Sequence, residues 1–578
     1  MEASNAFAAP GAGYLLLDDV GGFLTLVHEP TGETAPTGIV IVPPFGWEEV
    51  ASYRARRVWA ERLCSVGHVV LRFDLPATGD SSGADDDSHV VAQWIDAVDA
   101  AARDVGRRPG VRRVAVIALG LGGLLGVAAA ERGGFEDLVI WGAPASGRAA
   151  VRQQRALSRL QTHRALEEEA LPEGSLEASG FILSAETLAG LAAMEGAAGS
   201  TGSLERVLVL GRSGSTQDPG PAQALRASGV PVDLADGTGY DAMVDDPERV
   251  HVPPEATRQM EAWIDAAGEA PALRGAGTPR WIGRLGMGAI EEQPLAMPTG
   301  DGSLFGVLAQ PTAGPTSPLC AVFLNAGAIR RVGPNRLWVT AARWAAAHGI
   351  PSLRLDLPGI GDADGDPYRL EKVESFYEPD RTPEVRLAID HLAALGFGPC
   401  FAALGLCAGG YYAFRVAEED RRVTDAILLN PGALAWDDGL INRLRASKLT
   451  RVLSGQAWGR LLHGEIQTAQ VVHSVRALPR ASARAVRGRL SAASGATPVT
   501  LALDRLRERD ARVVLAFSGE EALESVLQAE GVLAGAGGRW PQLRLTTLPG
   551  LDHALRPAGA QRAALELMKN ALGDASGR

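Results

Sequence analysis

The sequence predicts an α/β protein made of two similar units, each with a mostly parallel sheet that helices cover on both faces. The first observation behind this prediction is an internal repeat. Residues 69–76 (VVLRFDLP) resemble residues 351–358 (PSLRLDLP), which lie 282 positions later. Single residues also match at this offset without a gap: Arg54 and Arg336, Gly67 and Gly349, and Gly79-Asp80 and Gly361-Asp362. Such a match indicates duplication of one unit.

The second observation is that strands and helices alternate in the same order in both copies. Apolar runs predict strands at 38–42, 69–75, 114–119 and 137–141, and again at 321–324, 351–357, 401–404 and 426–429. Spacing typical of helices falls between them, at 56–65 and 90–105, then at 337–348 and 382–395. Strands that are apolar on both faces and alternate with helices are typical of a buried parallel sheet.

Each copy then carries a long polar insertion, at about 145–203 and about 432–510. Insertions at this place in an open sheet lie above the carboxyl ends of the strands, where ligands bind, so we expect both to form helical caps. The resulting domain prediction is a first unit over 1–270, a linker over 271–294 and a second unit over 295–578. The linker is rich in Gly, Ala and Pro.

The third strand of the second copy runs into a sharp glycine-rich turn with a cysteine at its centre. Gly405-Leu-Cys407-Ala-Gly409 follows the strand and opens a helical pattern, as a nucleophile elbow does. The tight turn needs small neighbours at Gly405 and Gly409, and the helix N-terminus favours a thiolate at Cys407. The backbone N–H of Ala408 is then available to a developing oxyanion. The competing interpretation is that Cys407 is a small buried apolar residue.

A nucleophile of this kind needs a base and an acid later in the chain. His553 follows the predicted strand 543–547 and precedes the last helix, so it is the predicted base. Two acids follow the strand 513–517, and we favour Glu521 over Glu520 as the partner that orients the imidazole. Asp552, beside the histidine, is a weaker candidate.

The loop after the first strand of the second copy is the expected source of a second oxyanion donor. The backbone N–H of Ala326 or Gly327 is the candidate. Arg330, Arg331 and Arg336 follow in the same loop. Two roles are open for them: they hold the loop in place, which we favour, or they bind a substrate carboxylate.

The first copy lacks the corresponding chemical groups. Gly120 stands where the second copy has Cys407, and Ala242 stands where it has His553. The segment 210–214, which corresponds to the acid region, contains no carboxylate. Three losses together predict that the first unit is a pseudoenzyme.

At this point the chain resembles the α/β-hydrolase superfamily twice over, and looks like bacterial tandem hydrolases of poorly defined role. The residues that carry the resemblance are the segments Pro43–Glu48 with Tyr53-Arg54, and Asn325–Gly327 with Gly333–Arg336. The Cys407 elbow is similar to those of dienelactone hydrolases and polyhydroxyalkanoate synthases, which also use Cys, His and an acid. The resemblance therefore implies two tandem α/β-hydrolase-like units and covalent acyl transfer.

Composition excludes several classes of binding partner for this protein. The chain has 578 residues and a net charge of −12, which argues against nucleic-acid binding. Its four cysteines form no CxxC pair and accompany no histidine cluster, so we expect no metal and no cofactor. The N-terminus lacks a signal-peptide pattern, which predicts a cytoplasmic protein. The apolar run 114–130 is near the lower limit for a membrane span, but its four glycines favour a strand, a turn and a helix.

Together these features predict an acyl-transfer enzyme. An ester or thioester donor, as a small molecule or linked to a carrier, would acylate Cys407, and water, an alcohol or an amine would accept the group. Hydrolysis and transfer remain equal alternatives, and the oligomeric state is open. The rival hypotheses are a binding or scaffold protein with both units inactive, and an enzyme of another class, such as a lyase, on the same fold.

Overall fold

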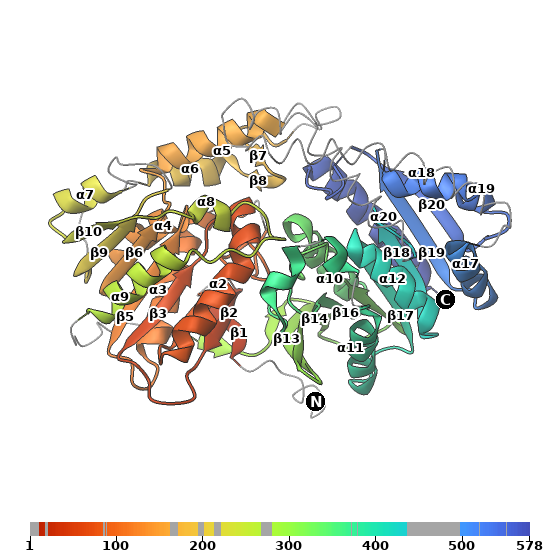
Figure 1. Ribbon diagram of the computed structural model, residues 1–578, viewed down its shortest axis with the longest axis horizontal. Coiled ribbons are helices and arrows are strands. Elements are labelled where there is room, and N and C mark those ends of the chain that lie inside the picture. Colours follow the sequence, from red (N-terminus) through yellow and green to blue (C-terminus); the bar gives the residue numbers. More distant parts are fainter. Residues whose placement is uncertain are drawn as a thin grey trace.

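The structure is a computed structural model of the whole chain. It describes residues 11–17, 21–84, 87, 89–161, 171–194, 202–212, 221–267, 280–371, 373–377, 380–435, 497–519, 521–550 and 552–577. These residues form two large sheets, which lie beside each other with helices around both (Figure 1).

The sheet of the first unit has nine strands among the described residues, and six of them run parallel to their neighbours. The strands in spatial order are β10 (Val232–Ala235), β9 (Arg206–Leu210), β6 (Asp137–Trp141), β5 (Arg113–Leu119), β3 (Thr37–Val42), β4 (Val70–Phe73), β2 (Gly21–His28), β1 (Ala12–Leu17) and β11 (Arg280–Ile282). The last three are antiparallel. The sequence analysis found the buried parallel strands but not this antiparallel edge.

The sheet of the second unit repeats this order. Its strands are β12 (Leu285–Met287), β13 (Ile290–Thr299), β14 (Gly302–Pro311), β16 (Ser352–Asp356), β15 (Leu319–Phe323), β17 (Cys400–Leu406), β18 (Val423–Leu429), β19 (Arg512–Ser518) and β20 (Leu543–Leu548). The expected linker 271–294 thus contributes β11 to one sheet and β12 to the other, and β13 begins inside it. Residues 271–279 lie outside the described part.

Helices cover both faces of each sheet, which confirms the predicted fold class. In the first unit α3 (Val90–Gly106) and α4 (Gly122–Ala130) pack on one face, and α2 (Trp47–Ser65) and α9 (Pro254–Asp265) on the other. In the second unit α11 (Thr382–Ala394), α12 (Ala408–Glu419) and α17 (Pro498–Glu508) face α10 (Leu337–Ala347) and α20 (Ala558–Ser576) across the sheet. The apolar run 114–130 is β5 followed by a turn and α4. In the described residues, none of the helices has the length and apolar character needed to cross a membrane.

The two insertions differ in how much of each is described. The first contains α5 (Gly147–Gln161), a hairpin of β7 (Leu176–Ala178) and β8 (Phe181–Leu183), and α6 (Ala185–Ala193). Of the cap expected at 432–510, residues 436–496 lie outside the described part. Its last portion is α17, which packs against α12.

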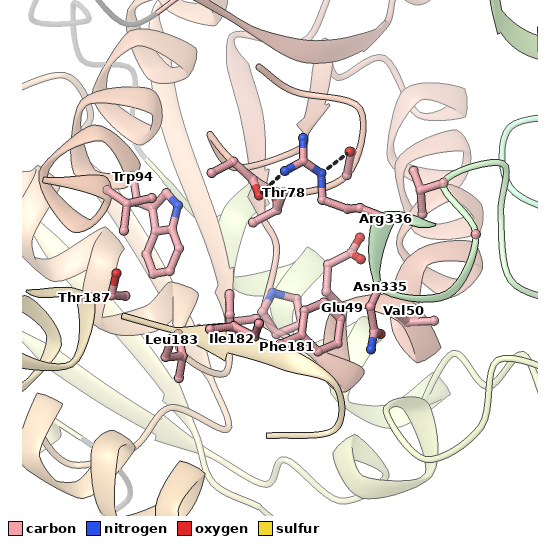
Figure 2. Close-up of a pocket in the computed structure, with 18 residues that line it drawn as sticks. Glu49, Val50, Thr78, Trp94, Phe181, Ile182, Leu183, Thr187, Asn335 and Arg336 are labelled. Atoms are coloured by element: carbon pink, nitrogen blue, oxygen red, sulfur yellow. Dashed lines mark hydrogen bonds between the residues drawn. The ribbon is translucent and has the colours of Figure 1, made fainter. Parts of the chain in front are cut away.

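The repeated sequence motif forms the contact between the two units. Arg54 donates to the carbonyls of Gly361, Ala363 and Gly365 at 2.9, 3.0 and 2.8 Å. Its counterpart Arg336 donates to the carbonyls of the corresponding turn in the first unit, at Ala77, Gly79, Ser81 and Gly83. Figure 2 shows two of these hydrogen bonds. Each unit therefore binds the equivalent turn of the other through the equivalent arginine. This reciprocal pattern is that of an isologous two-fold interface.

A buried charge network lies at the centre of this interface, and two of its ion pairs obey the same symmetry. Arg72 pairs with Asp362 at 2.8 Å, and the counterpart pair, Arg354 and Asp80, is 3.0 Å apart. Burial raises the pKa of Asp80, but Arg331, Arg354 and Arg330 outweigh it and hold that pKa at about 2. Unpaired charges would be very costly here, so each unit depends on the other to neutralise its buried groups.

The other arginines of the 325–336 loop belong to the same network. Arg330 pairs with Asp74 of the first unit at 2.9 Å, and Arg331 is fully buried between Asp80 and Asp356. Their role is therefore structural, and the alternative of a substrate carboxylate site is not supported.

Candidate active site

The turn between β17 and α12 has a strained backbone at Cys407, as the sequence predicts for this position. Cys407 has φ 57° and ψ −118°, and its N–H donates to the carbonyl of Leu429 at 3.1 Å. A Cβ on Gly405 would lie 2.1 Å from the carbonyl carbon of Gly409, and one on Gly409 would lie 2.3 Å from the Asn325 oxygen. Both positions therefore require glycine, and the sulfur is held at the N-terminus of α12.

His553 is held by a carboxylate. Its Nδ1 lies 2.9 Å from both oxygens of Glu521, which is the residue before α18 (Ala522–Ala529). Glu520, the other candidate, lies outside the described residues. Asp552 instead pairs with Arg556 at 2.8 Å and accepts from the N–H of Ala554. Of the carboxylates described here, Glu521 is thus the one placed to orient the imidazole.

The charge state of the histidine depends on Cys407. Burial lowers the pKa of His553, but the charge of Cys407 and the contact with Glu521 outweigh burial and raise that pKa to about 10. The raised pKa favours the imidazolium form of His553 beside the sulfur. A thiolate paired with an imidazolium is the reactive form of a nucleophilic cysteine.

Asn430 was not identified from the sequence, although it fixes the position of His553. It follows β18, has a positive φ of 40°, and its side chain donates to the carbonyl of His553 at 2.9 Å and to the Ser518 hydroxyl at 2.7 Å. The N–H of Ser518 donates back to its amide oxygen at 2.7 Å. An Asn directly after a buried strand was the available signal, because Asn tolerates positive φ and both donates and accepts.

Tyr377 is a second residue that sequence reasoning missed. Burial, the charge of Cys407, Tyr412 and a hydrogen bond with Cys407 raise the pKa of its hydroxyl well above the usual value. The tyrosine follows the short 3-10 helix η4 (Val373–Phe376), and its ring packs edge-on against Tyr411 with centroids 5.2 Å apart. No periodic pattern marks this loop in the sequence.

The loop expected to supply an oxyanion donor lies beside the elbow. The side chain of Asn325 donates to the carbonyl of Ile329 at 3.1 Å and accepts from the N–H of Leu357 at 2.8 Å. Ala326 is buried and Gly327 has a φ of +59°. The close approach of Gly409 to Asn325 places this loop next to Ala408, whose N–H, as the first of its helix, has no partner within that helix.

The corresponding site of the first unit keeps the backbone but is filled by other side chains. Gly120 has a φ of +51° and its N–H donates to the carbonyl of Trp141 at 2.9 Å. A Cβ there would lie 2.6 Å from a Glu48 oxygen and 2.7 Å from the Tyr240 hydroxyl. The Tyr240 hydroxyl donates to the Glu48 carboxylate at 2.9 Å, and Arg212 donates to the same carboxylate at 2.5 Å. Ala242, which aligns with His553, is exposed on α8 (Tyr240–Met243), so Tyr240 is the residue that faces the elbow.

A small cavity of about 40 Å³ lies in the first unit, near the interface. Aromatic and aliphatic side chains form much of its wall, with Glu49 and Arg336 at one side (Figure 2). This space holds a few water molecules at most, so it does not fit an acyl substrate. The described residues contain no group of His, Cys, Asp or Glu side chains that could hold a metal ion.

No protein-family model matches this chain, and a search of curated proteins found no similar sequence. Among solved structures it is similar to Est1E from Butyrivibrio proteoclasticus, with 18% identity and a TM-score of 0.31, over 44% of this chain and 100% of that one. It is also similar to a dienelactone hydrolase from Anabaena variabilis, with 14% identity and a TM-score of 0.31, over 50% and 99%. A thioesterase domain from the curacin biosynthetic pathway gives 14% identity and 0.30, over 48% and 99%.

Proposed function

We propose that the second unit is an acyl-transfer enzyme that carries the acyl group as a thioester on Cys407. The observation that supports this most directly is the arrangement of a cysteine with a strained backbone and a mostly buried imidazole whose Nδ1 lies 2.9 Å from Glu521. A merely structural cysteine needs neither a positive φ nor a histidine oriented by a carboxylate.

In the proposed acylation, the thiolate sulfur attacks the carbonyl carbon of an ester or thioester, and the carbonyl electron pair moves to the oxygen. The N–H groups of Ala408 and of Ala326 or Gly327 stabilise this oxyanion. When the oxyanion collapses, the bond to the leaving group breaks and His553 gives its proton to that group. Neutral His553 then takes a proton from the acceptor, which attacks the thioester and releases the thiolate.

The test is intact-protein mass spectrometry of the full chain mixed with a panel of acyl thioesters and activated esters. We expect a mass gain equal to the acyl group in the wild type and none in Cys407→Ala. Cys320→Ala is the matched control and should still form the adduct, because Cys320 is fully buried and burial raises its pKa. An adduct that persists in Cys407→Ala, or none from any donor, contradicts the proposal.

Adding water alone, alcohols or amines to the isolated adduct then identifies the acceptor. Discharge in buffer at the same rate with and without an added acceptor indicates a hydrolase. Faster discharge with a stable transfer product indicates a transferase.

We further propose that the first unit has no catalytic centre of its own. The groups that support this are Glu48, Tyr240 and Arg212, which leave no room for a side chain at Gly120. Its proposed part is to support the second unit through the shared interface.

A further inference from the structure

Two contacts hold the segment that carries Tyr377 against the helix that begins at Cys407. Tyr411 lies one helical turn after Cys407 in α12, and its ring packs against that of Tyr377 at 76° between planes. The next residue, Tyr412, donates from its hydroxyl to the carbonyl of Phe376 at 2.8 Å. The helix that begins at the nucleophile therefore anchors both the ring and the backbone of the segment that carries Tyr377.

The Tyr377 hydroxyl keeps its proton over the pH range in which proteins work, so it can donate a hydrogen bond. Burial, the charge of Cys407, Tyr412 and the hydrogen bond with Cys407 raise the pKa of Tyr377 well above 10, and Glu248 adds to this. The other charged groups that face the sulfur are the His553 imidazolium and, behind it, Glu521. Glu248 lies in the loop after α8 of the first unit, so the first unit contributes a charge near this site.

We propose that Tyr377 is a further catalytic residue, which donates a hydrogen bond to the Cys407 sulfur and stabilises it as a thiolate. This role deepens the acyl-transfer function proposed above and rests on it for its catalytic meaning. The same hydrogen bond serves the last step of the reaction: when the acceptor attacks the thioester, the carbon–sulfur bond breaks and its electron pair returns to the sulfur. Tyr377 then stabilises the charge that the sulfur regains.

A structural role for the tyrosine predicts a different result from a catalytic one. Tyr377→Phe keeps the ring and its packing against Tyr411, and removes only the hydroxyl. If the ring alone matters, the acidity of Cys407 does not change. If the hydroxyl stabilises the thiolate, its loss raises the pH at which the thiolate forms by about 1 to 2 units, which is the range for a hydrogen bond to a charged group.

The experiment measures the rate of iodoacetamide alkylation of Cys407 against pH, by peptide mass spectrometry of the full chain. We expect the midpoint to rise by about 1 to 2 pH units in Tyr377→Phe. The matched control is Tyr411→Phe, which loses a neighbouring hydroxyl and should keep the wild-type midpoint. Discharge of the acyl adduct should also slow at least about tenfold in Tyr377→Phe.

An unchanged midpoint in Tyr377→Phe, or an equal rise in Tyr411→Phe, overturns the proposal. If circular dichroism shows that Tyr377→Phe does not fold, Tyr412→Phe decides, because it releases the backbone of Phe376. A smaller rise of the midpoint is expected there, and no rise overturns the proposal. Alkylation needs no acyl donor, so a shifted midpoint without any acyl adduct supports the hydrogen bond and contradicts acyl transfer, whereas an adduct with an unshifted midpoint does the reverse.

Discussion

In both units the third strand of the repeat ends in a residue with positive φ, Gly120 at +51° and Cys407 at +57°. In each case its N–H donates to the carbonyl of the last residue of the neighbouring strand. Around Cys407 the neighbouring side chains are His553 and Tyr377, whereas around Gly120 they are Glu48 and Tyr240. The turn is thus a property of the fold, and chemistry depends on the side chains that face it.

The interface between the two units teaches the opposite lesson. Arg54 and Arg336 make equivalent contacts, as do Arg72 with Asp362 and Arg354 with Asp80. The part of the repeat that is most alike in the two copies is therefore the part that holds them together, and the elbow side chains are free to differ.

The largest effect should come from changing the side chain that faces each elbow. His553→Ala should lower acyl transfer by about a thousandfold or more, since both proton transfers are lost, with little change in stability. Tyr240→Phe should leave acyl transfer unchanged and lower the free energy of unfolding by about 1 to 3 kcal/mol, because Glu48 loses a buried partner. Single-turnover rates and urea unfolding measure the two effects. Equal loss of activity in both variants would show that the first unit takes part in catalysis.

The next effect concerns the residues that follow the equivalent strands β19 and β9. Glu521→Gln should slow acyl transfer by about 10² to 10⁴-fold. Glu521 raises the pKa of His553, so its loss lowers that pKa from about 10. The imidazolium is present below this pKa and lost above it, so the alkaline fall in activity should move to lower pH. Arg212→Gln, in the first unit, should keep the wild-type pH–rate profile. A profile that does not move in Glu521→Gln contradicts this assignment.

The interface can be tested with its two equivalent carboxylates. Asp80→Asn and Asp362→Asn each leave buried arginines without full compensation, and each should lower the free energy of unfolding by about 3 to 5 kcal/mol. Chemical denaturation of the two variants measures this loss. Asp301→Asn, at an exposed turn, is the control and should have no effect. A large difference between the two variants would mean that the network is not symmetric in energy.

Acid should weaken the same network. Arginines hold the pKa of Asp80 at about 2 and that of Asp362 well below its usual range, although burial alone would raise both. A carboxylate with a lowered pKa in the folded state stabilises it above its unfolded pKa and loses this contribution as pH falls through the folded value. Stability should therefore decline between about pH 4 and pH 2, and by less in Asp362→Asn. Unfolding monitored by tryptophan fluorescence measures the free energy of unfolding against pH. An identical decline in the wild type and in Asp362→Asn would show that the carboxylates of this network do not cause the loss of stability.

The smallest effect concerns the hairpin of the first insertion. Glu177 accepts from the N–H of Ala558 at 2.9 Å, at the start of α20, which follows His553. Glu177→Ala should lower the free energy of unfolding by about 0.5 to 1 kcal/mol, as the loss of a helix cap does. Glu173→Ala, at an exposed position of the same segment, is the matched control. If urea unfolding gives equal free energies of unfolding for both variants, the hydrogen bond between Glu177 and Ala558 does not contribute to stability.

The sequence was sufficient for the parallel strands, their helices and the sharp turn at Cys407, because periodicity and glycine spacing are local signals. It was not sufficient for contacts between distant segments. Arg330 was placed in a loop, but its partners Asp74 and Asp80 lie 256 and 250 residues away in the other unit. Arg331 likewise pairs with Asp80 of the first unit, in addition to Asp356 of its own. Tyr377 and Asn430 escaped notice for the same reason, since each acts on a residue that only the fold brings near.

The buried network has a consequence for synthesis of the chain. Asp80 pairs with Arg330 and Arg354, which follow it by 250 and 274 residues. At roughly 5 to 20 residues per second, the first unit leaves the ribosome about 10 to 50 s before these partners exist. Until then Asp74 and Asp80 lack Arg330 and Arg331, the second-unit arginines that pair with them. The first unit has Glu48 and Glu49 at the positions that correspond to these arginines, so a second copy of the first unit would bring acidic side chains to the same carboxylates. Only the second unit of the chain supplies the charges that this surface needs.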